Sequence, residues 1–221
     1  LLLLSADLYF SIRSPFSYIA LQQLERLLPG HNPAIAMQLK PLMPIAVRKT
    51  EVFHSMDPLV FRYLELDARR TAEMENIDIR VWPVPDPIVQ DLDTLAISTE
   101  QPYIWRLTRL LQCAIELNKG FEFAVALSRL IWDGKVDNWH TGKYIENVTS
   151  SVGLSFHEME TMIENKAEHY DAEFLANHEA LAEFGQWIPP TIVFEGEPFC
   201  DQDRVTIFLW RARQKYGSRG A

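Results

Sequence analysis

Two serines near the start of the chain occupy a position that could stabilise an anion. The segment FSIRSPFSYIALQQLERLL covers residues 10–28, with Ser14 directly before Pro15 and Ser17 three residues further on. Proline is favoured in the first turn of a helix, and leucines at helical spacing follow it, so a helix is predicted to begin just after Ser14. A hydroxyl at that end lies beside unpaired backbone N–H groups and the positive end of the helix dipole, which stabilise a thiolate supplied by a ligand.

Each serine also has a purely structural interpretation. Serine is a common N-cap, so Ser14 could do no more than cap the helix, and capping is compatible with catalysis. Ser17 lies in the first turn, where its hydroxyl either bonds to the backbone or contacts a ligand. Cys113 and Cys200 lie far apart and form no C-x-x-C pair, which argues against a disulfide framework or a zinc site. The six histidines show no H-x-x-x-H spacing, so no metal site is predicted.

The composition describes an acidic globular protein. The chain has 221 residues, a formal net charge of −9 and 48% hydrophobic residues, enough for a sizeable core. A chain this acidic would be repelled by nucleic acid and by an anionic membrane surface, so neither is an expected partner. The apolar run of residues 1–4 is too short for a membrane span or a secretion signal and is expected to lead into a strand. With only two cysteines, a reducing, cytoplasmic location is expected.

The hydrophobic period along the chain predicts the order of elements. Residues 8–12 and 34–39 read as strands on either side of the first helix, which makes them a parallel pair joined by a crossover. A hairpin is predicted at residues 191–199 and a last helix at 203–216. The long middle part is almost wholly helical, with predicted helices at Pro58–Asn76, Gln101–Asn118, Phe121–Asp133, Thr141–Val152, Ser155–Asn165 and Ala172–Phe184.

This order, with a proline just before the third strand, is the layout of thioredoxin with a helical insertion. We therefore predict an α/β protein with a thioredoxin-like domain of residues 1–56 and 185–221 and a large all-helical insertion domain of residues 57–184. In this layout a C-x-x-C pair lies where the first strand meets the first helix. Ser14 and Ser17 occupy those two positions, so no dithiol oxidoreductase activity is expected.

Four motifs resemble one branch of this fold, the kappa-class glutathione transferases and the 2-hydroxychromene-2-carboxylate isomerases. RSPFSYIA, residues 13–20, is similar to the F-S-P-Y-S-Y-L-A of that family. Lys40-Pro41 followed by Lys49 resembles the R-P segment of that family. The segment GQWIPPTIVF (185–194) resembles its G-V-F-G-V-P-T segment, and GEPFCDQDRV (196–205) resembles its hairpin and the G-Q-D-R-L start of its last helix. The resemblance covers nearly the whole chain and implies the DsbA-like, kappa-class architecture with a cis Pro190.

The resemblance also implies roles for individual residues. Ser14 would be the catalytic residue, hydrogen-bonded to the sulfur of glutathione. The residues implied for binding glutathione are Lys49, Pro189, Pro190, Thr191, Gln202 and Asp203. In this family the residue before the cis-proline pairs with glutathione through its backbone N–H and C=O, and Pro189, standing where valine is usual, has no N–H.

Some of these residues carry an alternative interpretation. Lys49 and its neighbour Arg48 could screen a thiolate or bind a substrate carboxylate, or they could be solvated surface groups. Asp203 either caps the last helix or recognises the amino group of glutathione. Trp82 and Tyr103 flank the proline-rich connection of residues 81–87 and belong either to the core or to the wall of an apolar pocket. The complete predicted substrate pocket is Phe16, Ser17, Arg48, Trp82 and Tyr103.

The function expected from the resemblance is a glutathione-dependent isomerase of the 2-hydroxychromene-2-carboxylate isomerase type. Reversible thiolate addition would turn a carbon–carbon double bond into a rotatable single bond. The substrate would be a small aromatic or electrophilic molecule, and a homodimer is among the expected assemblies. Two alternatives remain open: a kappa-like glutathione transferase, which would release the adduct, and a non-redox thioredoxin-fold module that binds peptides.

Overall fold

The computed structural model describes residues 3–31 and 34–216, and a four-stranded mixed sheet lies at its centre. The strands run in the order β2-β1-β3-β4, and their bounds are β1 Leu3–Phe10, β2 Ala34–Pro41, β3 Thr191–Phe194 and β4 Glu197–Cys200. β1 and β2 are parallel, whereas β3 is antiparallel to both β1 and β4. The predicted crossover unit and C-terminal hairpin are therefore confirmed, and the sheet is the one expected of a thioredoxin-like α/β fold.

The first two strands are longer than predicted. β1 begins at Leu3 rather than Leu8, and Leu4, Ala6 and Leu8 alternate inward along it and are all buried. β1 also ends at Phe10, because the next residues turn away from the sheet toward the first helix. The part of the predicted lead-in at residues 1–2 lies outside the described residues.

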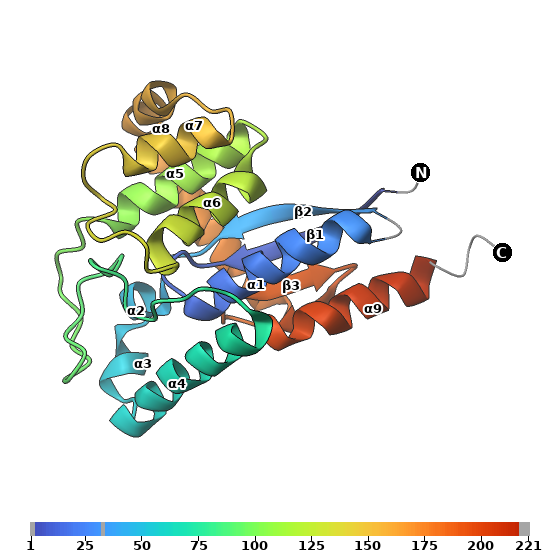
Figure 1. The fold of residues 1–221 in the computed structure, drawn as a ribbon, viewed down its shortest axis with the longest axis horizontal. Helices are drawn as coiled ribbons and strands as arrows, with labels where there is room; N and C mark the ends of the chain where they lie inside the picture. The colour runs from blue at the N-terminus through green and yellow to red at the C-terminus, as the bar shows by residue number, and fades with distance from the viewer. Residues whose placement is uncertain (1–2, 32–33, 217–221) are drawn as a thin grey trace.

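Helices surround the sheet, and most lie close to their predicted ranges (Figure 1). Their bounds are α1 Pro15–Leu27, α2 Ile45–Arg48, α3 Thr50–His54, α4 Pro58–Glu75, α5 Ile104–Glu116, α6 Gly120–Trp132, α7 Tyr144–Ser151, α8 Phe156–Glu183 and α9 Val205–Tyr216. Short 3₁₀ turns at Leu28–Gly30 (η1) and Gln202–Arg204 (η2) follow α1 and precede α9. The short helices α2 and α3 were not predicted.

Several predicted helix boundaries are corrected, among them the start of α7, which lies at Tyr144 rather than Thr141. The two helices expected at Ser155–Asn165 and Ala172–Phe184 form the single helix α8, with a non-helical backbone at Lys166 that marks a kink. α5 begins at Ile104 rather than Gln101, because the Gln101 side chain bonds to the backbone of Val89 and Ser98 and holds the chain in a loop. The last helix likewise begins at Val205 rather than Asp203, after the 3₁₀ turn.

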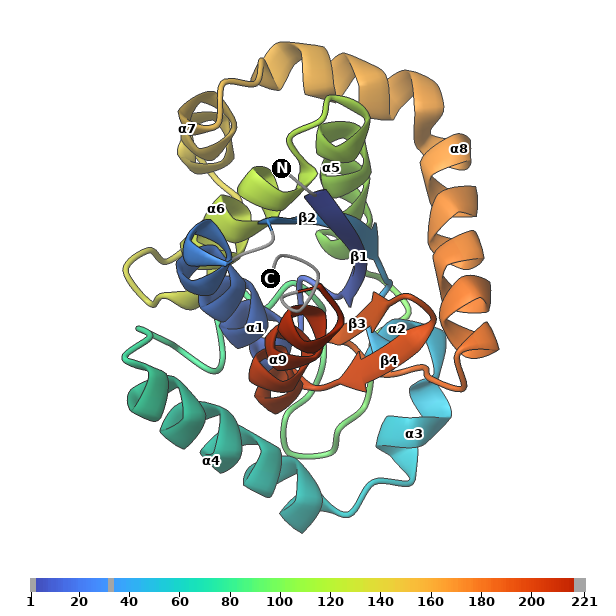
Figure 2. The ribbon, with the colours of Figure 1, turned by 90° about the vertical axis from the view of Figure 1, so that its right-hand side faces the viewer.

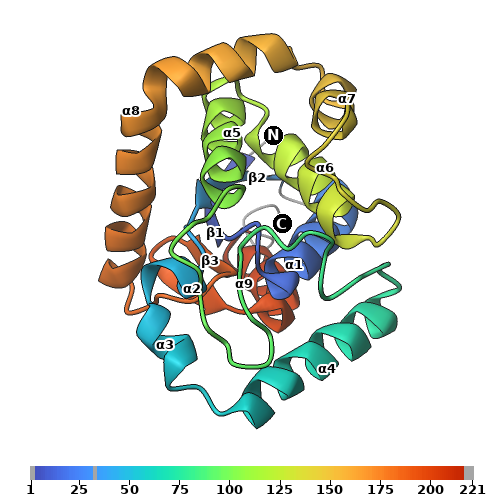
Figure 3. The ribbon, with the colours of Figure 1, turned by 90° about the vertical axis from the view of Figure 1, so that its left-hand side faces the viewer.

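The helices form groups on different sides of the sheet. Figures 2 and 3 show α5, α6, α7 and the start of α8 beyond the β2 edge, and α8 continues down one side of the molecule to the level of β4. α4 lies opposite α7 and the start of α8, and α2 and α3 connect toward it. One continuous cluster of buried apolar side chains joins the sheet, α1 and the helices α5 to α8. The division into domains of residues 1–56 with 185–221 and of residues 57–184 stays a prediction. No helix among the described residues is long and apolar enough to span a membrane.

Buried aromatic side chains fix the turn that precedes α1. Trp132 of α6 donates from Nε1 to the carbonyl oxygen of Ile12 at 2.8 Å, and Trp139 donates to the carbonyl oxygen of Pro85 at 2.7 Å. Both indole rings are almost completely inaccessible to solvent. Because buried hydrogen bonds of this kind hold the backbone in one place, the helical part of the chain positions both the α1 N-terminus and the loop that faces it.

Candidate active site

The hydroxyl of Ser14 caps α1 as predicted. Ser14 has an extended backbone (φ −90°, ψ 120°), and its Oγ accepts a hydrogen bond from the backbone N–H of Ser17 at 3.1 Å. Pro15 occupies the first helical turn, where its missing N–H costs nothing. Since Oγ accepts from the backbone and the described residues offer its proton no acceptor, the Ser14 O–H remains free to donate to a bound group.

Ser17 has a different environment. It is 1% exposed, and its Oγ accepts from the backbone N–H of Ser11 at 3.3 Å. It does not line the cavity in front of Ser14. Of the two serines that take the redox positions, Ser14 therefore faces the cavity and Ser17 supports the turn beneath it.

The N-terminus of α1 opens onto an apolar cavity of about 300 Å³. Its aromatic wall is made of Phe16, Phe53, Phe61, Trp82 and Trp187. Phe61 of α4 stacks on Trp82 with ring centroids 5.1 Å apart, and Phe53 of α3 packs edge-on against Phe61 at 6.2 Å. Such a cavity suits a small planar molecule with an aromatic ring.

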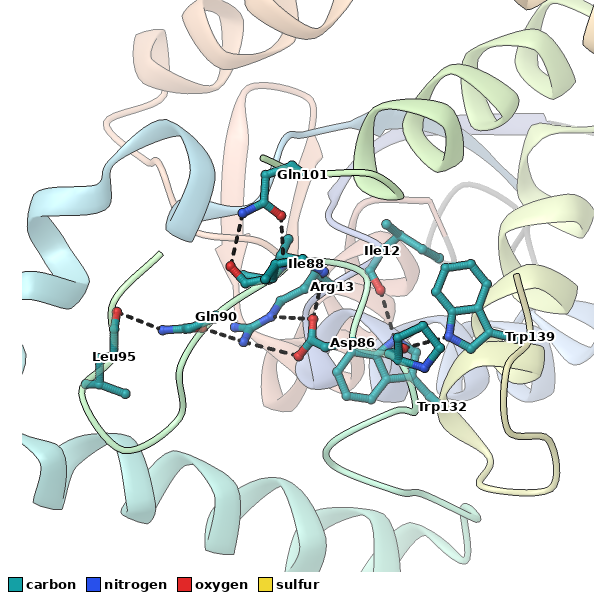
Figure 4. A network of polar contacts seen from close by, with 11 residues as sticks. Ile12, Arg13, Asp86, Ile88, Gln90, Leu95, Gln101, Trp132 and Trp139 are labelled. Carbon is teal, nitrogen blue, oxygen red and sulfur yellow. Dashed lines mark hydrogen bonds and ion pairs between the residues drawn. The ribbon is translucent and has the colours of Figure 1, made fainter. Parts of the chain in front are cut away.

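Arg13 lines the cavity and forms a largely buried ion pair with Asp86, which does not line it. The guanidinium of Arg13 donates from Nε and Nη2 to the two carboxylate oxygens of Asp86 at 3.3 and 3.4 Å, and Nη2 also donates to Gln90 at 2.8 Å (Figure 4). Asp86 in turn accepts from the backbone N–H of Ile88 at 2.9 Å. The Arg13 side chain is 9% exposed and lies over the Trp82 ring, 5.4 Å from its centroid. This network fixes the loop that carries Trp82.

Arg48 and Lys49 lie outside the cavity and contact one of its walls. Arg48 donates to the carbonyl oxygens of Met43, at 3.2 Å, and of Trp187. The Lys49 ammonium lies 4.8 Å from the centroid of the Trp187 ring. Both cations thus hold the loop before β3 against the segment after β2, and neither lines the cavity.

The loop before β3 and the turn before α9 supply the remaining predicted residues. The Pro189–Pro190 peptide is cis, as predicted, and Pro189 lines the cavity. Pro190 does not line it, and its carbonyl accepts from the backbone N–H of Asp201 at 2.8 Å. Thr191 is fully buried and donates from Oγ1 to the carbonyl oxygen of Ile188 at 2.7 Å. Thr191 therefore supports the loop rather than the cavity surface.

Asp201, rather than the predicted Asp203, forms the cap in this region. The Asp201 carboxylate accepts from the backbone N–H of Gln202 at 2.8 Å and lines the cavity, where burial raises the pKa of its carboxyl. Asp203 is exposed and forms an ion pair with Arg204 at 2.6 Å. Gln202 is 7% exposed, and its Oε1 is buried without a hydrogen-bond partner among the described residues.

Tyr103 lies away from the cavity, which corrects the expectation that it walls the pocket. Its ring packs edge-on against Trp139, with centroids 5.6 Å apart, and lies tilted against His140 at 4.8 Å. The chain between Trp82 and Tyr103 folds back on itself through an isolated bridge between Gln90 and Ile97, and this separates the two aromatic residues.

Sequence reasoning missed several cavity residues, among them Arg13, Phe53, Phe61, Asp201 and Trp187. A signal was available for Arg13, since it replaces the phenylalanine of the F-S-P motif directly before the serine. The aromatic residues carried no such signal, because Phe53 lies on the short helix α3, Phe61 on the largely exposed helix α4 and Trp187 in the loop before β3. Among the described residues, no group of three or more histidine, cysteine or acidic side chains is arranged to hold a metal ion.

Comparisons with known proteins agree with this fold. No family model and no curated protein sequence matches the chain. Among solved structures, a 2-hydroxychromene-2-carboxylate isomerase is similar at 18% identity with a TM-score of 0.66, covering 98% of this chain and 100% of its own. A probable DsbA oxidoreductase from Streptomyces coelicolor is 15% identical with a TM-score of 0.67, covering 99% of this chain and 92% of its own.

A third similar structure is the cytosolic disulfide reductase DsbM from Pseudomonas aeruginosa, at 16% identity and a TM-score of 0.59, covering 99% of this chain and 100% of its own. The same reductase with GSH is similar at 14% identity and a TM-score of 0.55, covering 95% of this chain and 100% of its own. At these identities the likeness shows the fold, and the chain has the DsbA-like thioredoxin fold.

Proposed function

We propose that this protein is a glutathione-dependent isomerase of the 2-hydroxychromene-2-carboxylate isomerase type. The observation that supports it best is the Ser14 hydroxyl, which caps α1, keeps its proton free to donate and faces an apolar cavity. Among the similar structures, the isomerase of that name supports the isomerase class, and the reductase with GSH supports glutathione as the ligand. The abundance of glutathione in reducing compartments fits the proposed cytoplasmic location.

Two residues next to the cavity wall, Gln202 beside Asp201 and Lys49 beside Trp187, suit glutathione. The buried and unpartnered Oε1 of Gln202 is an acceptor that a glutathione ammonium group would satisfy. The Lys49 ammonium, held over Trp187, makes no ion pair with the described residues and would pair with a glutathione carboxylate. When bound, glutathione would supply the thiolate that adds reversibly to an electrophilic carbon.

Each residue of the site then has a defined task. The Ser14 O–H donates a hydrogen bond to the ligand's sulfur. Together with the N-terminus of α1, this hydrogen bond stabilises the negative charge of the thiolate. The aromatic wall excludes water and aligns a planar substrate against this position. Pro189 offers the ligand its carbonyl oxygen alone, because proline has no backbone N–H.

Dithiol chemistry is not part of this proposal. Serines take both redox positions, and the two cysteines lie on α5 and β4, outside the cavity wall. Burial raises the pKa of the Cys113 thiol to about 11 and also raises that of Cys200, so neither thiol is activated.

Calorimetry with glutathione, combined with ultraviolet difference spectroscopy of the bound thiol, tests the proposal. We expect glutathione to bind and its sulfur to ionise at lower pH than in solution. Product analysis with a cis-configured enone then separates isomerisation, which returns free glutathione, from a kappa-like transfer reaction, which releases the adduct. Absence of glutathione binding would refute the proposal and favour the peptide-binding alternative.

A further inference from the structure

The backbone of Asp201 has a conformation that favours glycine. Its φ of +80° and ψ of 162° lie outside the left-handed helical region, in a part of conformational space that only glycine adopts without strain. In the G-Q-D-R-L motif that residues 201–205 resemble, glycine stands at this position. The chain therefore keeps a carboxyl group where the backbone conformation disfavours any side chain.

Three hydrogen bonds hold Asp201 in this conformation. Its backbone N–H donates to the carbonyl oxygen of Pro190 at 2.8 Å, and its own carbonyl oxygen accepts from the backbone N–H of Arg204 at 3.2 Å. One carboxylate oxygen, Oδ1, accepts from the backbone N–H of Gln202 at 2.8 Å. Backbone strain that the surroundings impose in this way clusters at functional sites, which points to a task for the Asp201 side chain.

The second carboxylate oxygen of Asp201 is available to a molecule in the cavity. Asp201 lines the cavity, and its Oδ2 makes no hydrogen bond with the described residues. The two other ionisable side chains of the described wall are paired, Arg13 with Asp86 and Glu65 with Arg69. Asp201 is thus the one ionisable group of the described cavity wall that has no ion pair.

The turn that carries Asp201 lies beside the helix that carries Ser14. The 3₁₀ turn η2 directly after Asp201 packs against α1, and both Asp201 and Ser14 line the same cavity. A molecule in this cavity therefore meets a free hydroxyl from one element and a free carboxyl oxygen from the other. Two groups of this kind can act on two different atoms of one electrophile.

We propose that Asp201 is a second catalytic residue, an acid–base group that exchanges a proton with the carbonyl oxygen of the electrophile, an inference that rests on the proposed function. The carbonyl oxygen of an enone takes the proton of the Asp201 carboxyl as the β-carbon gains the sulfur, and the two π bonds become one enol double bond. The original double bond is now single and rotates. The Asp201 carboxylate then takes the proton back, the original double bond re-forms and the sulfur departs as thiolate.

The surroundings of this carboxyl favour its protonated form. Burial raises the pKa of Asp201 against the hydrogen bond from Gln202, and the carboxylates of Asp203 and Asp67 raise it further against the charge of Arg204. The rate should fall as the pH rises through this raised pKa, because a general acid must carry its proton. Ionisation of the thiol acts in the opposite direction, so a bell-shaped pH profile is expected.

Two substitutions of Asp201 separate catalysis from backbone strain. Asp201→Asn keeps an oxygen for the cap but has no carboxyl proton. We expect its kcat for glutathione-dependent isomerisation of cis-4-phenyl-3-buten-2-one to fall about 10²- to 10⁴-fold, with the alkaline fall of the pH profile lost and glutathione affinity in calorimetry unchanged. Asp201→Gly should lose the same activity, although its melting temperature should rise by about 2 °C or more because the strain is relieved.

Asn118→Gly is the matched control, because Asn118 also has a positive φ, of +59°, and lies on the surface outside the cavity. It should leave the rate unchanged. The inference is overturned if Asp201→Asn keeps its rate, if it loses glutathione affinity instead of kcat, or if Asp201→Gly is no more stable than the wild type. A wild-type protein that neither binds glutathione nor isomerises the enone would refute the proposed function and the inference together, whereas a glutathione-dependent isomerase that tolerates Asp201→Asn would refute the inference alone.

Discussion

Replacement of Ser14 by alanine, aspartate and threonine separates its two tasks. Ser14 Oγ accepts from the backbone N–H of Ser17, which is capping, and its O–H is free to donate to the ligand sulfur, which would be catalysis. Alanine removes both functions. Aspartate is as good a cap as serine, but it lacks the proton and would place a negative charge beside the thiolate. Threonine retains both functions.

The expected magnitudes differ between stability and activity. Loss of an N-cap costs about 1 kcal/mol, which lowers the melting temperature by about 2–4 °C in a chain of this length. Loss of a positioned donor to a developing anion lowers the rate by about 10²-fold or more. Ser14→Ala should therefore show both losses, Ser14→Asp should lose activity at unchanged stability, and Ser14→Thr should resemble the wild type.

Thermal unfolding and glutathione-dependent turnover are measured on the same preparations. The matched control is Ser155→Ala, because Ser155 caps α8 by accepting from Glu158 at 3.3 Å and does not line the cavity. This variant should lose stability without losing activity. Full activity in Ser14→Asp would show that Ser14 only caps the helix. Full activity in Ser14→Ala together with its loss in Lys49→Met would move the thiolate role elsewhere.

Three further predictions concern pH, affinity and redox chemistry. Burial, assisted by the charge of Arg48, lowers the pKa of His178 to about 4, so between pH 6.5 and about 4 the unfolded chain binds a proton that the folded chain does not. In denaturant titrations, the free energy of unfolding should fall by up to about 3 kcal/mol as the pH drops through this window. His178→Gln should abolish this decrease, and the control His157→Gln, at an exposed site, should retain it. Pro189→Val supplies a backbone N–H and should tighten glutathione binding about three- to a hundred-fold in calorimetry, whereas no binding in either form would favour a different thiol or a peptide ligand. Insulin reduction should not exceed the rate without enzyme, and turnover that survives replacement of Cys200 would contradict this.

The parts of the fold that sequence predicted are those determined by neighbouring residues. The helix after Ser14 follows from a serine, a proline and leucines within one short segment, and the strand pair follows from runs of alternating apolar residues. α2 and α3 could not be predicted in this way, since four or five residues contain little more than one helical turn. The sequence predicts two helices in place of α8, because the residues around Lys166 are polar and the backbone is kinked there. The helix continues past the kink because buried residues on both sides of Lys166 pack against the rest of the protein.

The candidate site was less predictable because its charges are paired over long distances in the sequence. Arg13 and Asp86 are 73 residues apart, and nothing near either residue identifies the other. Lys49 was expected at a ligand, but the described structure holds it over Trp187, which comes much later in the chain. Motif resemblance can therefore suggest the reaction, whereas the substrate depends on contacts that only the folded chain reveals.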